Sequence, residues 1–252
     1  MKSKNIVLFG QTGAGKSSVV NLIAGEEKAM TSLGTQSCSR HWTEHSIAFD
    51  GHKYTVFDTA GLEDPECGVE EYLEAIMNAR TLIMKLEKEG GIDLLLFCVR
   101  AGRVTSTTLN NYRLVYEWLC EKKFPIVLVL TGLEKEQNME DWWIRNKVTF
   151  DRYEISFDGH VCVTAANNLD GRHQELYQQS RQLVRNLVEE HTYGRPGSGW
   201  KGANKWFRRF MRKELLFRHN FIKNDDTVTV LTTRCGMPRE AAVLLATRVR
   251  QA

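Results

Sequence analysis

A glycine-rich segment near the N-terminus has the residue types that cradle phosphate groups. Residues 10–17 read G-Q-T-G-A-G-K-S and follow an apolar run at residues 6–9. This pattern supplies backbone N–H groups that curl around phosphate oxygens, a lysine for the β- and γ-phosphates and a hydroxyl for Mg²⁺. Residues 18–23 have the apolar spacing of a helix whose positive N-terminal end would face the phosphates. The sequence therefore predicts a nucleoside triphosphate site with the contacts Thr12, Gly13, Ala14, Gly15, Lys16, Ser17 and Ser18.

The second half of the same site is predicted at Asp58-Thr59-Ala60-Gly61, which follows an alternating apolar run. In an α/β sheet, an acid at the end of a strand is delivered to the crevice that also holds the phosphate loop. We expect Asp58 to hold Mg²⁺ through water and Ser17 to ligate it directly. The N–H of Gly61 is expected to approach the γ-phosphate.

The elements that must position these residues alternate between strand and helix. Short apolar runs rich in β-branched residues predict six strands, at residues 5–9, 46–49, 54–57, 93–99, 125–130 and 161–164. Helical patterns occur notably at residues 107–122, 140–152 and 172–191. Asp50-Gly51, between the second and third runs, indicates a hairpin. The predicted fold is α/β, a doubly wound, mostly parallel six-stranded sheet with one antiparallel edge strand and a C-terminal helical extension.

A linker rich in glycine at residues 193–199 predicts a nucleotide-binding domain at 1–192 and a basic amphipathic helical extension at 193–252. Residues 195–223 contain nine basic residues and one acid, a net charge of +8, whereas the whole chain carries +3. Aromatic residues interleave with these charges, which indicates a cationic amphipathic helix. Its preferred partner is the first domain, then an anionic membrane surface; no nucleic acid partner is expected, because no recognition module is present. Residues 239–250, after Pro238, predict one more amphipathic helix, which binds a partner helix or the domain itself.

Cysteine usage favours a reduced, intracellular compartment. None of the six cysteines forms a C-x-x-C pair, and Cys98 and Cys162 lie inside apolar runs. Both are therefore predicted to be small core residues and not zinc ligands. The first strand begins right after Met1–Lys4, which leaves no room for a signal peptide, and no apolar run approaches the ~20 residues of a membrane-spanning helix. We expect a cytoplasmic protein, with peripheral contact to a membrane left open.

Two further motifs resemble those of a known family. Thr35-Gln36-Ser37-Cys38, followed by Asp58-Thr59-Ala60-Gly61-Leu62, resembles the Thr-x-x-Cys and Asp-Thr-x-Gly-Leu pattern of immunity-associated GTPases of the GIMAP type. Residues 101–105, A-G-R-V-T, are similar to the Gly-Arg-x-Thr box that follows the fourth strand in that family. The resemblance covers roughly the first 190 residues, and septins and the chloroplast-envelope Toc GTPases are neighbouring families.

This resemblance implies a P-loop GTPase sheet and a nucleotide-dependent homodimer of G domains. It also implies that Thr35 is the switch residue that completes the Mg²⁺ shell. Composition alone does not choose Thr35, because the same loop offers several hydroxyls, and an ordinary polar loop residue is the other interpretation: the candidates are Thr31, Ser32, Thr35, Ser37 and Ser39.

The base-reading segment departs from the usual pattern of Asn or Thr, then Lys, then Asp, because residues 131–134 are Thr-Gly-Leu-Glu. Thr131 keeps the first position, and the Glu134 carboxylate can accept hydrogen bonds from guanine N1 and N2, donors that adenine does not present in that arrangement. The lysine stem that usually covers the base is missing. Ala165 and Ala166 in T-A-A-N resemble the Ser-Ala-Lys turn whose N–H groups meet the guanine oxygen. The resemblance supports GTP and GDP as ligands, and an ATP site is the open alternative.

Leu62 stands where many GTPases place the glutamine that orients water. Because leucine cannot hydrogen-bond the nucleophile, we expect slow turnover by the monomer. In GIMAP-type proteins the arginine that matches Arg103 reaches across the dimer as a finger, so the implied catalytic set is Lys16, Thr35, Gly61 and Arg103. Arg103 as a solvated loop residue or as a salt-bridge partner is the other interpretation. The expected function is Mg²⁺-dependent GTP hydrolysis, and the alternatives are a GTP-dependent assembly scaffold or an ATPase.

Overall fold

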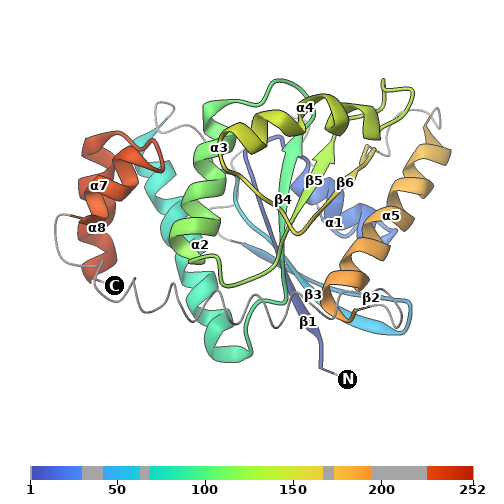
Figure 1. The fold of residues 1–252 in the computed structure, drawn as a ribbon. Helices are drawn as coiled ribbons and strands as arrows, with labels where there is room; N and C mark the ends of the chain where they lie inside the picture. Colours follow the sequence, from blue (N-terminus) through green and yellow to red (C-terminus); the bar gives the residue numbers. More distant parts are fainter. Residues whose placement is uncertain (1, 30–41, 63–67, 167–172, 195–225, 252) are drawn as a thin grey trace.

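The computed structural model describes residues 2–29, 42–62, 68–166, 173–194 and 226–251. Its centre is a six-stranded sheet with the strand order β2-β3-β1-β4-β5-β6 (Figure 1). The parallel strands are β1 (Lys4–Phe9), β3 (His52–Asp58), β4 (Leu94–Arg100), β5 (Ile126–Thr131) and β6 (Gly159–Cys162). The edge strand β2 (Thr43–Phe49) runs antiparallel to β3. The predicted sheet is confirmed.

The hairpin between β2 and β3 turns at Asp50 and Gly51, whose φ angles are 48° and 78°. Two central residues with positive φ give a turn whose twist matches that of the flanking strands, which is why Asp-Gly is favoured there. The predicted hairpin is confirmed, and it makes β2 the antiparallel edge.

Helices cover both faces of the sheet (Figure 1). α1 (Lys16–Ala24) and α5 (Gln174–Thr192) lie on one face, and α2 (Val69–Glu89), α3 (Ser106–Tyr112) and α4 (Glu140–Arg152) pack on the other. Because side chains alternate along a strand, Ile6 and Leu8 of β1 pack against α1 and α5, whereas Val7 and Phe9 join the cluster of the opposite face. Two hydrophobic clusters therefore hold the parallel strands between helices.

Two of the predicted elements have different bounds in the structure. The helix expected over residues 107–122 begins at Ser106 and changes into a stretch of π-helix, η2 (Arg113–Leu119), after which the N–H of Cys120 bonds to the carbonyl of Val115, five residues back. The last strand ends at Cys162 and not at Thr164, because the N–H of Thr164 bonds to the hydroxyl of Ser180 on α5 and so leaves the ladder. Neither pattern is visible in local hydrophobic periodicity.

Two C-terminal helices lie on the outer side of α2, where one packs on α2 and the two pack on each other (Figure 1). They are α7 (Asp226–Thr233), which the sequence did not predict, and α8 (Arg239–Gln251), which it did. Leu231, Ala242 and Leu245 are fully buried and belong to the same hydrophobic cluster as α2. Arg248 of α8 also contacts Glu70 in the first turn of α2 at 2.7 Å. The described part of the extension therefore shares a core with the sheet domain; residues 195–225 lie outside the described residues.

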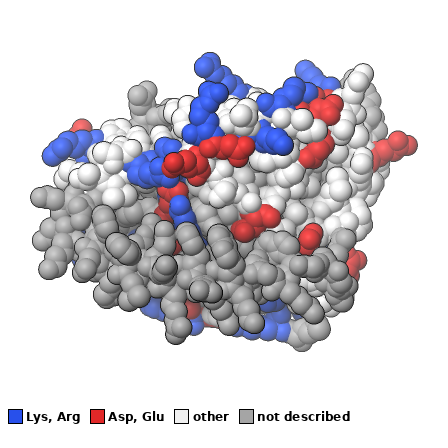
Figure 2. Space-filling view, in the orientation of Figure 1, with Lys and Arg blue, Asp and Glu red and all other residues white. Residues whose placement is uncertain are grey.

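Among the described residues, the surface shown in Figure 2 carries both Lys or Arg and Asp or Glu side chains, separated by areas of other residues. None of the described helices is long and apolar enough to cross a membrane. The cysteines that the structure describes, Cys98, Cys120, Cys162 and Cys235, are buried and unpaired, as expected for core residues.

Glu117 of η2 anchors the C-terminal helices to the sheet domain. Its side chain is buried, and its carboxylate accepts hydrogen bonds from Arg234 Nε at 2.9 Å and Nη2 at 3.2 Å, while Lys122 lies at 2.8 Å. Burial disfavours the charged form, but the bonds from Arg234 and Lys122 outweigh it and hold the pKa of Glu117 below its usual value. The ion pair therefore contributes stability above the unfolded-state pKa of 4.5, and this contribution is lost as the pH falls through the lower folded-state pKa.

Replacing Glu117 with alanine should lower the free energy of unfolding by about 1–3 kcal/mol at pH 7, because two cations lose a buried partner while staying partly hydrated. Urea denaturation measures this, and the gap from wild type should narrow as the pH falls through the lowered pKa of Glu117. Glu27→Ala, an exposed carboxylate without a described partner, is the matched control. Equal midpoints for the two variants at pH 7 would disprove the anchoring role.

Candidate functional site

The phosphate loop has the conformation that its glycines predict. Gly13 and Gly15 have φ angles of 73° and 85°, and a β-carbon on Gly10 would overlap the carbonyl oxygen of Cys98 on β4. Gly15 precedes α1 without a side-chain cap, and the first turn of α1 contains no acid. The N-terminal N–H groups of α1 and its dipole therefore favour an anion at this position.

Lys16 folds back over the phosphate loop. Its Nζ donates to the carbonyls of Gly10 at 3.2 Å and Gln11 at 3.1 Å, although the residue is only 8% exposed. These two bonds hold the ammonium group at the phosphate loop, where a charged donor would strengthen the binding of an anion.

Ser17 and Asp58 meet beside the loop. The Ser17 hydroxyl donates to Asp58 Oδ2 at 2.6 Å, and Asp58 Oδ1 is buried without a hydrogen-bond partner among the described residues. Burial raises the pKa of Asp58, opposed by the Ser17 hydroxyl and by the charges of Lys16 and His45. A hydroxyl beside a buried carboxylate with an unsatisfied oxygen suits a hard cation such as Mg²⁺ and its waters, so these residues fit the metal.

Gly61 lies against the phosphate loop, where a β-carbon on it would overlap the Thr12 side chain. The following N–H, of Leu62, donates to the Gly10 carbonyl at 3.2 Å, and the Leu62 carbonyl accepts from the buried Asn111 side chain at 3.0 Å. The segment after β3 is thereby held between the phosphate loop and α3. Asn111 was missed by sequence reasoning, because nothing in a helical pattern identifies a partner that is 49 residues away.

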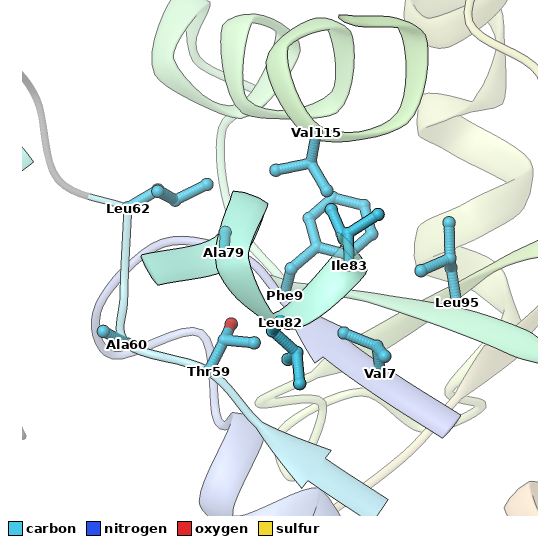
Figure 3. Close-up of a pocket in the computed structure, with 10 residues that line it drawn as sticks. All are labelled: Val7, Phe9, Thr59, Ala60, Leu62, Ala79, Leu82, Ile83, Leu95 and Val115. Atoms are coloured by element: carbon cyan, nitrogen blue, oxygen red, sulfur yellow. The ribbon is translucent and has the colours of Figure 1, made fainter. Parts of the chain in front are cut away.

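The Leu62 side chain points away from the phosphate loop. It is 2% exposed and lies at an apolar pocket between β1, α2 and η2, where its neighbours include Phe9, Ala79 and Val115 (Figure 3). Leu62 is thus a core residue. Its side chain neither hydrogen-bonds water nor points toward the phosphate loop.

Because of this burial, Leu62→Gln should not create a water-orienting residue. The amide would enter an apolar pocket, so we expect a loss of about 2–4 kcal/mol in the free energy of unfolding and no gain in GTP turnover. Leu62→Met, similar in volume and apolar, should cost less than about 1.5 kcal/mol. Thermal unfolding and phosphate release measure the two effects. A stable Gln variant with faster turnover would contradict this orientation of residue 62.

The base-reading segment is joined to the phosphate loop by Thr131. Its buried hydroxyl donates to the Ala14 carbonyl at 2.9 Å, and a β-carbon on Gly15 would lie 3.1 Å from the same hydroxyl. Glu134, two residues beyond Gly132, is half-exposed, while Leu133 between them is buried. The segment that would read a base is therefore fixed relative to the segment that would hold the phosphates.

The remaining predicted residues that the structure describes lie at the same edge of the sheet. Ala165 and Ala166 follow β6, which pairs with β5 up to Leu130 and Cys162. Ser18 is in the first turn of α1, which follows the phosphate loop. Thr35 lies outside the described residues.

Arg103 is exposed in the loop between β4 and α3. The loop ends at Thr105, whose Oγ1 accepts from the N–H of Thr108 at 3.2 Å and caps α3. Arg103 forms no hydrogen bond or ion pair with any residue that the structure describes. Its guanidinium is therefore presented to the surface from a loop anchored at both ends.

His45 is a second residue that sequence reasoning left without a role. It is 9% exposed on β2 and lies close enough to Asp58 to influence that carboxylate electrostatically. The alternation of buried positions along β2 was the signal available for it, since residues 45, 47 and 49 share the face toward α1.

Solved structures with the same fold include chloroplast translocon GTPases. Toc33 from Arabidopsis thaliana with GDP and Mg²⁺ has a TM-score of 0.51 at 19% identity, covering 76% of this chain and 85% of Toc33. A dimerisation-deficient arginine-to-alanine mutant of Toc33 has a TM-score of 0.52 at 19% identity, covering 77% and 86%. A structure described as showing that dimerisation is important for the GTPase activity of atToc33 and psToc159 has a TM-score of 0.55 at 18% identity, covering 78% and 86%. These identities establish the fold alone.

Comparison with known sequences identifies the family of this chain. Immune-associated nucleotide-binding protein 7 from Arabidopsis thaliana is 30% identical over 195 residues, which cover 73% of this chain and 60% of that protein. The tRNA modification GTPase MnmE from Treponema denticola is 30% identical over 132 residues, covering 52% of this chain and 26% of the enzyme. The chain thus spans 60% of the first relative and about a quarter of the second. The AIG1 family profile matches residues 4–199, and the chain is a G-domain protein of the AIG1 family.

Proposed function

We propose that this chain binds GTP with Mg²⁺ and hydrolyses it to GDP and phosphate, and that pairing of two G domains accelerates the reaction. The observation that carries the proposal is the bond from Thr131 to the Ala14 carbonyl, since it fixes a base-reading segment beside a phosphate loop. Membership of the AIG1 family and the fold shared with Toc33, which was solved with GDP and Mg²⁺, support the choice of guanine.

The residues would divide the work by chemistry. Lys16 and the N–H groups at the start of α1 bind the β- and γ-phosphates, and the N–H of Gly61, which lies against the phosphate loop, would approach the γ-phosphate. Ser17, Asp58 and Thr35 would hold Mg²⁺, which when bound neutralises charge on the phosphates. Glu134 accepts from guanine N1 and N2, and the backbone of Ala165 and Ala166 meets the guanine oxygen.

Hydrolysis by an isolated protomer is expected to be slow, because the Leu62 side chain is buried and cannot orient water as a glutamine at this position would. An arginine from a second copy would supply the missing stabilisation, and Arg103 suits this role because its exposed guanidinium has no described partner. The dimerisation recorded for the Toc proteins supports the same arrangement.

A GTP-dependent assembly scaffold with negligible hydrolysis is the second candidate, and the burial of Leu62 favours it. GTP turnover per protomer, measured with Mg²⁺ across a wide range of protein concentration, separates the two. Specific activity that rises with concentration supports dimer-activated hydrolysis. Bound GTP with turnover near zero at every concentration supports the scaffold and refutes the catalytic role of Arg103.

The C-terminal extension is expected to have a role of its own, apart from GTP hydrolysis. We propose a G domain at residues 1–192 and an extension at 193–252, of which α7 and α8 pack on the G domain. For residues 195–223, the net charge of +8 and the interleaved aromatics support contact with an anionic membrane surface by a cytoplasmic protein. Sedimentation of the full chain with anionic and with neutral vesicles distinguishes this contact from docking on the domain.

A further inference from the structure

The base-reading segment lacks a side chain that would cover the face of a bound base. Position 132, where a lysine stem usually lies against the base, is glycine. Leu133 does not replace it, because its side chain is 1% exposed and belongs to the hydrophobic core. Glu134 would pair with the edge of guanine, and its charged carboxylate offers no apolar surface for the face of the base. A cover must therefore come from another element.

Arg100, the last residue of β4, lies across Gly132. Arg100 is paired in register with Thr131 on the neighbouring strand, and the N–H of Ala101 donates to the Thr131 carbonyl at 2.7 Å. A β-carbon placed on Gly132 would lie 3.2 Å from Cγ and 3.5 Å from Nε of Arg100. The stem of Arg100 and a side chain at position 132 would thus compete for the same space.

The Arg100 side chain is also available to a ligand. The residue is exposed, and it forms no hydrogen bond or ion pair with any residue in the described part of the chain. A guanidinium is planar and weakly hydrated, and it stacks on aromatic faces, so it can lie against a purine while its stem excludes water. Gly132 itself has a φ of 77°, a conformation that glycine adopts without strain.

We propose that Arg100 is the base-covering residue of this site, with its side chain over Gly132 forming the surface on which the purine of a guanine nucleotide stacks. This assignment rests on the proposed function. A stacking contact acts on the base and not on the γ-phosphate, so Arg100 strengthens the binding of GTP and GDP by the same factor. It adds affinity, whereas Glu134 discriminates guanine from adenine.

Calorimetric titration of the full chain with GDP, GTP and inorganic pyrophosphate tests this role. Arg100→Ala should weaken GDP and GTP binding equally, by roughly three- to thirtyfold, and leave pyrophosphate binding unchanged. Arg100→Met, which keeps an apolar stem without the guanidinium, should fall between wild type and Arg100→Ala. Arg152→Ala, an exposed arginine at the C-terminal end of α4 without a described partner, is the matched control and should bind like wild type.

Any other result would disprove a specific part of the proposal for Arg100 or of the proposed function. Unchanged GDP affinity in Arg100→Ala, with normal binding by wild type, disproves the role of Arg100 alone. A parallel loss of pyrophosphate affinity would make Arg100 a phosphate ligand, and a loss of turnover at saturating GTP without a loss of affinity would make it a catalytic group. Either result disproves the base contact. A wild-type chain that binds no nucleotide overturns the proposed function itself.

Discussion

Replacing Lys16 with alanine should weaken GTP and GDP binding by about 10²–10³-fold, the largest effect on affinity that we expect from one substitution. Lys16 is 8% exposed, and its Nζ donates to the carbonyls of Gly10 and Gln11 in the phosphate loop. An anion in the loop would therefore gain a charge-assisted hydrogen bond in a place that water screens poorly. Calorimetric titration with Mg²⁺ and GTP measures the loss.

The control for this variant is Lys147→Ala, an exposed lysine on α4 that has no described partner. It should bind GTP like wild type. GMP, which lacks the β- and γ-phosphates, should bind Lys16→Ala and wild type equally weakly. If Lys16→Ala retained GTP affinity within about threefold, the phosphate loop would not be the nucleotide site.

Replacing Arg103 with alanine should reduce turnover at high protein concentration by about 10³-fold or more, within the range that arginine fingers contribute. GTP affinity should stay within about twofold of wild type, because an arginine supplied by the partner acts on charge that develops during the reaction and not on the ground state. Phosphate release, measured at protein concentrations where wild-type specific activity has reached its plateau, reports this loss.

Arg103→Lys is the informative companion variant, since it keeps the charge but loses the planar fork that clamps phosphate oxygens, and it should recover little activity. Arg152→Ala again serves as the arginine control. Turnover that does not depend on protein concentration, or that survives Arg103→Ala, would contradict hydrolysis by a dimer through this residue.

Local sequence signals predicted the phosphate loop, the hairpin and the mostly parallel six-stranded sheet, because the preferences that determine these features are those of neighbouring residues. Glycines with positive φ at positions 13 and 15, the Asp50-Gly51 turn and the apolar runs of the parallel strands all express conformational or burial preferences of neighbouring residues. The Ser17–Asp58 contact was also predictable, since strand ends in such a sheet converge on one crevice.

Contacts between distant segments were beyond that reasoning. The direction of the Leu62 side chain depends on α2 and η2 packing around it, and the bond from Asn111 to its carbonyl spans 49 residues. The Arg100 side chain lies over Gly132 because of the register between β4 and β5. The hydrophobic periodicity of the sequence does not reveal this register. The docking of α7 depends likewise on Glu117, 117 residues from Arg234. Tertiary packing decided each of these features.

The most direct test of a guanine nucleotide site is a comparison of GTP and ATP binding to the wild-type chain, by calorimetric titration with Mg²⁺. Glu134 can pair with guanine N1 and N2 but would face adenine without those donors, so we predict that GTP binds at least about 100-fold more tightly than ATP. Equal affinity for the two nucleotides, tighter binding of ATP, or no binding of either would contradict the account.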